Sequence, residues 1–278
     1  MFRYTKKTLL REALLILVAL IFLLPFYFLI NLSLKNGNDA LTTSAMQLVT
    51  NPTLDAFGQA IRGGRQATLM DGMLNSIIIT AGSVLILVAV GSISAYTLSR
   101  RTGKLSKAAM GLILVTMVLP AQAAIIPIYV GMRNVGLVGT HAGTIIMYAG
   151  ALLPISIFLY MGFTNGIARD YEEAAQIDGA SRFTVFRKIV FPLLSPATGT
   201  VAIFTGLIVW NDFFTGLIFL NGSDAVTLPV VIYNFVGESV SQWNVIFAAI
   251  IISMIPILAF FLVAQKQFIQ GFTGGVKS

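Results

Sequence analysis

The sequence has no cysteine, a single histidine and only 10% charged residues among its 278 positions. Without cysteine it has no disulfide framework, no thiolate zinc site and no thiol nucleophile. The scarcity of charge comes with 56% hydrophobic residues and a mean hydropathy of +0.86, which excludes an ordinary soluble globular domain. The composition therefore predicts an integral membrane protein.

Long apolar runs define the expected fold. A hydrocarbon core of roughly 30 Å needs about 20 apolar residues in helix, and six runs of this kind are separated by polar breaks. They cover residues 13–34, 73–99, 108–132, 142–163, 197–220 and 245–264. The runs are continuous, unlike the alternating segments of about ten residues that form membrane β-barrels. We expect an all-α integral membrane protein with six transmembrane helices in a single domain, residues 1–278.

The lysines and arginines fall unevenly between the breaks, and they predict the orientation. Fourteen of the 18 lie before the first run, between the second and third, between the fourth and fifth, or after the last. The other four are Lys35, Arg62, Arg65 and Arg133. Because cationic loops stay in the cytoplasm, both termini are expected there. The net charge of +7 therefore indicates topology, and no nucleic-acid partner is expected.

One charged stretch, EEAAQIDGASRFTVFRKIVFP, stands between the fourth and fifth runs and ends at Pro192. Asp170 can cap a first helix that carries Glu172 in its first turn, and Gly179 can end that helix in a left-handed conformation. A second helix is expected from near Ser181 to Pro192. The pattern predicts a helix pair outside the membrane.

Each expected helix of the pair has a face of one kind. Tyr171, Ala174 and Ala175 share one face, and Phe183, Phe186 and Val190 share the other. Alanines allow a close approach of another backbone, and a phenylalanine pair can anchor in a groove. The pair is either a docking element for a partner protein or an amphipathic loop that lies on lipid headgroups.

The spacing Glu173-Ala174-Ala175, three residues, Gly179, nine residues, Ile189, two residues, Pro192 resembles the EAA loop of permease subunits of ATP-binding-cassette importers. Asp178 and the following PLLSP resemble the carbohydrate branch, which includes the maltose-importer permease. The resemblance extends over most of the chain. It implies the type I importer permease fold, with a cytoplasmic coupling helix pair at residues 169–195, between helices 4 and 5.

In that family the loop sits in a cleft of the cytoplasmic ATPase and carries its closure into the membrane. The resemblance assigns coupling to Glu173, Ala174, Ala175, Asp178, Gly179, Phe183, Phe186, Ile189 and Pro192. The glycine-rich tail QGFTGGVKS resembles a family segment that reaches the ATPase interface, which implies contacts at Gly274, Gly275 and Lys277.

The motor itself is expected on another chain, because no G-x-x-x-x-G-K-[ST] motif occurs in this sequence. This chain is therefore not expected to be an enzyme or to bind a cofactor, and ATP and Mg belong to the partner. The resemblance implies two copies of an ATPase subunit, a second permease, an extracytoplasmic solute-binding protein and a sugar substrate. It implies a location among the lipids of the cytoplasmic (inner) membrane of a prokaryote.

Trp210, Asn211 and Asp212 are the candidate residues for the sugar path. Asp212 is the only carboxylate within an apolar run, and placing it in lipid costs about 2.5 to 3.5 kcal/mol. An aromatic ring with an amide and a carboxylate can bind sugar hydroxyls. The alternative is structural: Asp212 bonds a neighbouring helix, and Trp210 marks headgroup depth.

Two other function classes are open to comparison. An ion-coupled secondary carrier or channel could use Asp212, but it would be expected to have several intramembrane ionisable groups and an internal repeat. An intramembrane enzyme would need a nucleophile with a base, or a metal cluster. His141 has no second histidine or carboxylate at ligand spacing, so no metal site is expected.

Overall fold

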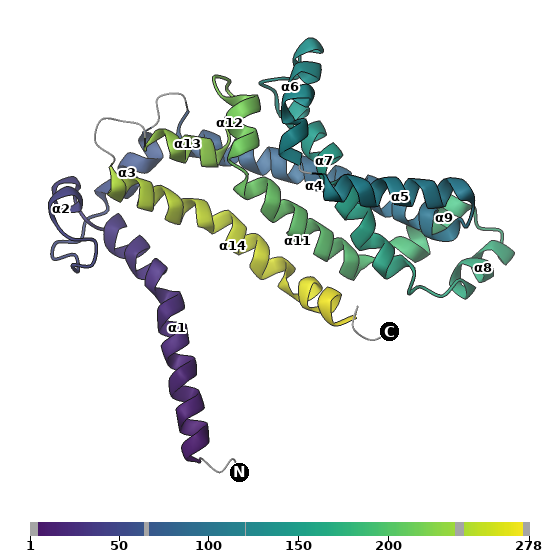
Figure 1. Cartoon of the computed structure of the whole chain (residues 1–278), viewed down its shortest axis with the longest axis horizontal. Coiled ribbons are helices and arrows are strands. Elements are labelled where there is room, and N and C mark those ends of the chain that lie inside the picture. Colours follow the sequence, from purple (N-terminus) through teal and green to yellow (C-terminus); the bar gives the residue numbers. More distant parts are fainter. Residues whose placement is uncertain (1–4, 64–66, 120, 237–241, 275–278) are drawn as a thin grey trace. The chain divides into compact units, whose positions relative to one another are not determined.

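The computed structural model describes residues 5–63, 67–119, 121–236 and 242–274, and every regular element in these ranges is helical (Figure 1). In chain order the elements are α1 (Lys6–Ser33), α2 (Gly37–Thr42), α3 (Asp55–Arg62), α4 (Leu69–Arg100), α5 (Lys104–Val118), the 3-10 turn η1 (Ala121–Ala124), α6 (Ile125–Asn134), α7 (His141–Thr164), α8 (Asp170–Ile177), α9 (Arg182–Val185), the π-helical turn η2 (Phe186–Val190), α10 (Phe191–Leu193), α11 (Ser195–Asn211), α12 (Phe214–Leu220), α13 (Leu228–Asn234) and α14 (Trp243–Gly274).

Four of the expected spans are continuous helices. Within the described residues, α1, α4, α7 and the first 20 residues of α14 are long and apolar enough to cross a membrane. The segment from Arg182 to Leu193 and α11 pass the same test together, although they meet at a bend of 73°. The described part of the chain thus has four apolar helices long enough to cross a membrane, or five with the bent pair.

The expectation of one continuous helix over residues 108–132 is wrong. Helix α5 ends at Val118, and α6 begins at Ile125 after the short turn η1. Leu119 caps α5 with an extended backbone, at φ −72° and ψ 132°. The sequence explains this break, because a residue before proline is pushed out of the helical region and position 120 is proline.

The run at residues 197–220 is likewise divided, which the hydropathy did not predict. Helix α11 ends at Asn211, Asp212 has an extended ψ of 110°, and α12 begins at Phe214. The Asp212 carboxylate accepts hydrogen bonds from the backbone N–H groups of Phe214 at 2.9 Å and Thr215 at 3.2 Å. Aspartate favours this capping position, because it satisfies N–H groups that a new helix leaves without partners.

The described residues belong to two compact units, one of residues 1–70 with 231–255 and one of residues 71–230 with 256–278. In the first unit, polar side chains attach the loop after α2 to the end of α1. Asn31 donates to the carbonyls of Ala45 and Gln47 at 2.9 Å each, and Lys35 donates from Nζ to Ser44 O at 2.8 Å. These bonds give the buried Asn31 and Lys35 oxygen partners without a carboxylate.

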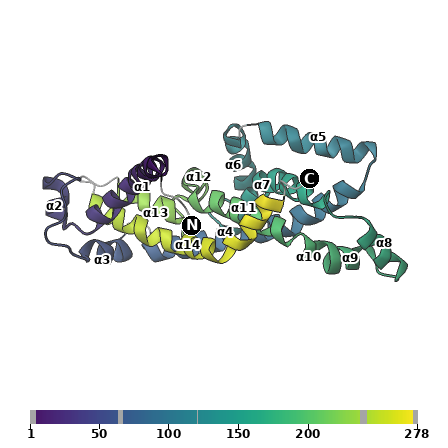
Figure 2. The ribbon, with the colours of Figure 1, turned by 90° about the horizontal axis from the view of Figure 1, so that it is seen from below.

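The core of the second unit joins four stretches of helix. Ala95 of α4, Ile157 and Tyr160 of α7, Val185 and Val190 near the bend, and Val201 of α11 form one buried cluster. In Figures 1 and 2, α8 lies at an end of this unit and leads through α9 toward α11. The cluster therefore connects the 169–195 segment to three of the apolar helices.

Close packing in this unit predicts different effects for two glycines of α7. A Cβ at Gly143 would collide with the Leu137 carbonyl, whereas a Cβ at Gly150 would meet nothing within 4 Å. We expect Gly143→Ala to destabilise the protein by about 1 to 3 kcal/mol, because the backbone before α7 must shift. Gly150→Ala is the control, since alanine favours helix there. Thermal unfolding in mild detergent measures both, and equal melting temperatures would contradict the packing.

Candidate functional site

The segment from α8 to α10 is helical on both sides of the turn at Gly179, and its start differs from the expectation. Gly179 turns the chain at φ +83°, as predicted, and Ser181 accepts the N–H of Thr184 at 3.3 Å as the cap of α9. Asp170 was expected to cap α8, but it is the first helical residue, and Arg169 occupies the cap position without a side-chain bond. The carboxylate of Asp170 still lies in the first turn, where it favours the helix dipole.

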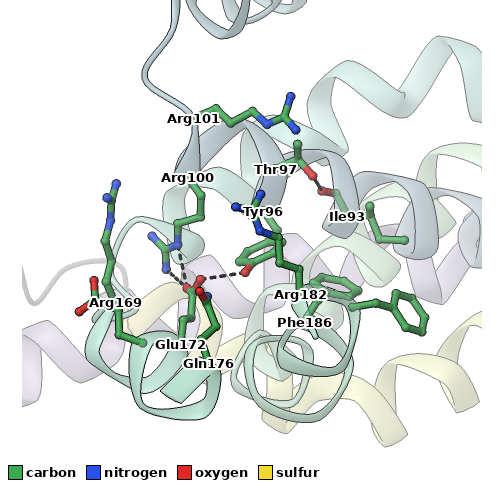
Figure 3. Close-up of a pocket in the computed structure, with 12 residues that line it drawn as sticks. Ile93, Tyr96, Thr97, Arg100, Arg101, Arg169, Glu172, Gln176, Arg182 and Phe186 are labelled. Atoms are coloured by element: carbon green, nitrogen blue, oxygen red, sulfur yellow. Dashed lines mark hydrogen bonds and ion pairs between the residues drawn. The ribbon is translucent and has the colours of Figure 1, made fainter. Parts of the chain in front are cut away.

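Glu172 is the structural centre of this segment, and only 5% of it is exposed. Its Oε1 pairs with Arg100 at the end of α4, 2.6 Å from Nη2 and 2.8 Å from Nε. Its Oε2 accepts the Tyr96 hydroxyl at 2.8 Å (Figure 3). Arg100 Nη2 also donates to the Ile167 carbonyl at 3.0 Å. Because both carboxylate oxygens have partners, α8 is fixed to α4 at this residue.

The motif residues next to Glu172 are open to solvent. Glu173 and Ala174 are exposed and Ala175 is half-buried against the core cluster. Two large apolar side chains of α8 are also exposed, Tyr171 at 59% and Ile177 at 87%. Since residues three apart share a helix face, Tyr171, Ala174 and Ile177 form an apolar strip that the described part of the chain leaves uncovered. We call these three residues the apolar strip.

The expected phenylalanine pair is divided between surface and core. Phe183 is 65% exposed, whereas Phe186 is 9% exposed. The Phe186 ring packs against Tyr96 at a centroid distance of 5.4 Å and against Phe191 at 5.9 Å. The expectation that both rings share one exposed face is wrong, because the second ring is needed to hold the segment against α4.

The end of the motif lies in an irregular turn. Ile189 is half-buried in the π-helical turn η2, and Pro192 is exposed in α10. Asp178 and Gly179 are exposed at the tip between the helices. Proline supplies no backbone N–H, so a change of hydrogen-bond register just before Pro192 fits the sequence.

A cleft of about 420 Å³ lies between the last turns of α4 and the α8–α9 segment. Its charged lining consists of Arg100, Arg101, Arg169, Arg182, Glu172 and Glu173. Figure 3 shows the Arg100–Glu172 pair among the other arginines of the lining, with Arg182 reaching toward Tyr96. We call this cavity the arginine cleft.

The three candidate sugar-path residues do not converge on one site. Trp210 is buried, and Asn211 is exposed and donates from its amide to the Leu207 carbonyl at 2.8 Å. Asp212 accepts the Tyr148 hydroxyl of α7 at 3.1 Å while it caps α12. The contacts of Asp212 thus match the structural alternative, in which the carboxylate bonds a neighbouring helix.

The remaining residues discussed in the sequence analysis are His141 and the three tail residues Gly274, Gly275 and Lys277. His141 Nε2 lies 2.8 Å from Asn75 Oδ1, and the Asn75 amide donates to the carbonyls of Asp224 and Val226. Asn75 Oδ1 must therefore accept, so His141 donates from Nε2. Gly274 is the last residue of α14, and Gly275 and Lys277 lie outside the described residues.

Sequence reasoning identified Glu173 but missed Glu172 as the buried glutamate. The two are adjacent, and the partner Arg100 lies 72 positions earlier in the chain. A first-turn glutamate and an arginine at the end of an apolar run were both visible in the sequence. Nothing in their spacing indicated that they meet.

Residues 87–274 match the family described as "Binding-protein-dependent transport system inner membrane component". Since this match covers more than half of the chain, the protein belongs to this family, and it is a membrane permease subunit. The family does not favour an ion-coupled carrier that uses Asp212.

Two curated relatives span almost the whole chain. The "Melibiose/raffinose/stachyose import permease protein MelC" of Bacillus subtilis (strain 168) is 36% identical over 260 residues, which cover 93% of this chain and 92% of MelC. The "Probable starch degradation products transport system permease protein AmyC" of Thermoanaerobacterium thermosulfurigenes is 31% identical, covering 94% of this chain and 93% of AmyC.

A solved structure has the same fold. One chain of the "Crystal structure of a bacterial ABC transporter involved in the import of the acidic polysaccharide alginate" superposes with a TM-score of 0.83 at 23% identity. The match covers 96% of this chain and all of that one. It supports the permease fold and says nothing of the substrate of this chain.

The Glu172 contacts predict unequal effects for two adjacent glutamates. Glu172→Ala leaves the Arg100 guanidinium, only 16% exposed, without its carboxylate and should cost about 3 to 5 kcal/mol of stability. Glu173→Ala removes an exposed side chain and should change stability by less than about 0.5 kcal/mol. Melting temperature and the rate of tryptic cleavage after Arg182 measure the difference. Similar values for both variants would contradict the fixing of α8 by Glu172.

Proposed function

We propose that this chain is one of two permease subunits of an ATP-driven sugar importer and forms half of its translocation path. Sugar is the inferred cargo because MelC is named for the import of melibiose, raffinose and stachyose, and AmyC for the transport of starch degradation products. A related solved assembly, at a TM-score of 0.67, is described "in complex with alginate pentasaccharide-bound periplasmic protein". We infer an extracytoplasmic solute-binding protein as a partner here as well.

The proposed assembly also has a second permease and two copies of a cytoplasmic ATPase, which carry ATP and Mg. The sequence motif that binds nucleotide phosphates is absent from this chain, which supports a separate motor. The unequal distribution of lysine and arginine supports an inner-membrane topology with both termini in the cytoplasm. In this topology the broken segments at residues 108–132 and 197–220 each complete one of six crossings in a single permease domain.

Coupling is the proposed task of the segment from residue 169 to 195, and the apolar strip on α8 carries this proposal. A soluble loop rarely exposes Tyr171 and Ile177 to this extent unless a partner covers them. We propose that the strip enters a cleft of the ATPase, with Glu173, Asp178, Gly179 and Phe183 at its border.

Motion of the ATPase can then reach the membrane by two contacts. The Glu172–Arg100 pair joins α8 to α4, and the packing of Phe186 on Tyr96 joins the following turn to the same helix. Ala175, Ile189 and Pro192 support the segment between the strip and α11. A short helix held in this way moves with its partners, so closure of the ATPase would displace α4 and α11 together.

Two other groups have supporting roles in this proposal. Asn211 and Asp212 are candidates for the wall of the sugar path, since Asn211 ends α11 and Asp212 follows it in the break before α12. Gly274, Gly275 and Lys277 are candidates for contacts with the ATPase, because they follow the last span on the proposed cytoplasmic side.

The assembly is testable by mass. The tagged chain, purified from its native membrane in mild detergent, should give a native mass of two different permeases and two ATPase copies. Ile177→Asp should lose the ATPase copies and keep the second permease, because it places a charge in the apolar strip. Leu105→Asp changes an exposed leucine outside the strip and is the control. A homo-oligomer without ATPase, even after crosslinking from a cysteine at Ala174 of the strip, would refute the importer assignment.

Coupling itself is testable at Gly179, where substitution acts through the backbone alone. A Cβ there meets nothing within 4 Å, but φ is +83°. Gly179→Val should cost about 1 to 2 kcal/mol in this left-handed conformation and shift the tip of the pair. We expect intact assembly and ATPase activity with strongly reduced sugar uptake in vesicles. Gly179→Asn, which tolerates this conformation, is the control, and normal uptake by the valine variant would contradict coupling.

A further inference from the structure

The arginine cleft lies at the end of α4, one of the helices long and apolar enough to cross a membrane. Helix α4 has 32 residues, which at 1.5 Å per residue is about 48 Å, longer than a hydrocarbon core of roughly 30 Å. In the proposed topology, its last turns, which carry Tyr96 and Arg100, lie at the level of the headgroups. Tyrosine and arginine are common at this depth. In the proposed orientation this is the cytoplasmic leaflet, which contains the anionic lipids.

The cleft keeps a positive charge after its internal pairing. Four arginines and two glutamates line it, and Glu172 is paired with Arg100. The remaining Arg101, Arg169 and Arg182 are exposed, and among the lining residues Glu173 is the other carboxylate. Because guanidinium groups match the geometry of phosphate oxygens, this lining favours a phosphate group.

The cleft also has apolar walls that a free ion would not need. Ile93, one turn before Tyr96, is 46% exposed, and Phe183 on the opposite side is 65% exposed. A phospholipid has a phosphate next to glycerol and acyl carbons, so it can contact the arginines and these side chains at once.

The centre of the proposed ATPase docking surface, the apolar strip, lies on a different side of α8 from the cleft, and Glu173 and Phe183 border both surfaces. Residues follow at about 100° in a helix, so Glu172, Glu173 and Gln176 face the cleft and the apolar strip faces away from it. An ATPase docked on the strip would therefore leave the arginine side chains of the cleft accessible.

We propose that the arginine cleft binds the phosphate of an anionic phospholipid, and that this lipid buttresses α8 against α4. The orientation of the cleft toward the cytoplasmic leaflet rests on the proposed function. The expected ligand is a phospholipid whose headgroup has a net negative charge, such as phosphatidylglycerol.

Native mass spectrometry of the purified assembly, titrated with phosphatidylglycerol or with neutral phosphatidylcholine, tests this site. The double variant Arg101→Gln/Arg182→Gln removes two cations from the cleft. At about 1 kcal/mol for each cation near a lipid surface, the affinity for phosphatidylglycerol should fall on the order of 30-fold. Binding of phosphatidylcholine should not change.

The control variant is Arg187→Gln/Lys188→Gln, which removes the same charge from exposed side chains of η2 outside the cleft lining. An equal loss of phosphatidylglycerol in both variants would overturn the site. Displacement of the lipid by inorganic phosphate at equal concentration would assign the cleft to the free ion and overturn the lipid.

Loss of the ATPase copies from the cleft variant, with phosphatidylglycerol still bound, would identify the occupant as the ATPase and overturn the proposal. Absence of ATPase from the unmodified assembly would refute the proposed function instead. The binding of phosphatidylglycerol to the purified chain could still be measured in that case. The two failures are therefore distinguishable.

Discussion

The buried contact between Glu172 and Arg100 is the constraint on which the polar end of this protein depends. Helix α8 has eight residues, and isolated helices shorter than about 12 to 15 residues are marginal in water. Its apolar strip faces away from the chain, so hydrophobic burial contributes little to holding it. The ion pair, with the Tyr96 hydroxyl on the second carboxylate oxygen, supplies the missing attachment to α4.

The attachment of Glu172 to α4 determines which side chains of the segment are exposed. With Glu172 turned inward, helical geometry places Tyr171, Ala174 and Ile177 outward and leaves Glu173 at the border. On the following turn, the burial of Phe186 against Tyr96 leaves Phe183 as the exposed ring. One buried carboxylate and one buried ring thus separate the proposed docking surface for the ATPase from the arginine cleft.

The sequence predicted the apolar helices and the helix pair because these depend on local properties. Run length gave four of the spans, and Gly179 marked the turn through its conformational freedom. The break after Leu119 could have been predicted from the proline that follows it. The break at Asp212 could not be read from hydropathy, because its polar residues stand between strongly apolar stretches. The Glu172–Arg100 contact was not predictable, since it joins residues on elements far apart in the chain.

The same contact explains why a motif of small and charged residues can serve a mechanical role. A helix attached only by apolar packing can slide, because dispersion contacts have little directional preference. The Glu172 carboxylate is held at both oxygens, since Oε1 accepts from the Arg100 guanidinium and Oε2 from the Tyr96 hydroxyl, and this resists both translation and rotation of α8 relative to α4. The buried core shared by α4, α7 and α11 also contains Val185 and Val190, which precede the bend of 73° before α11. This core therefore connects the fixed segment to the apolar helices. A force on the apolar strip would therefore move helices of the membrane and would not be absorbed by the loop.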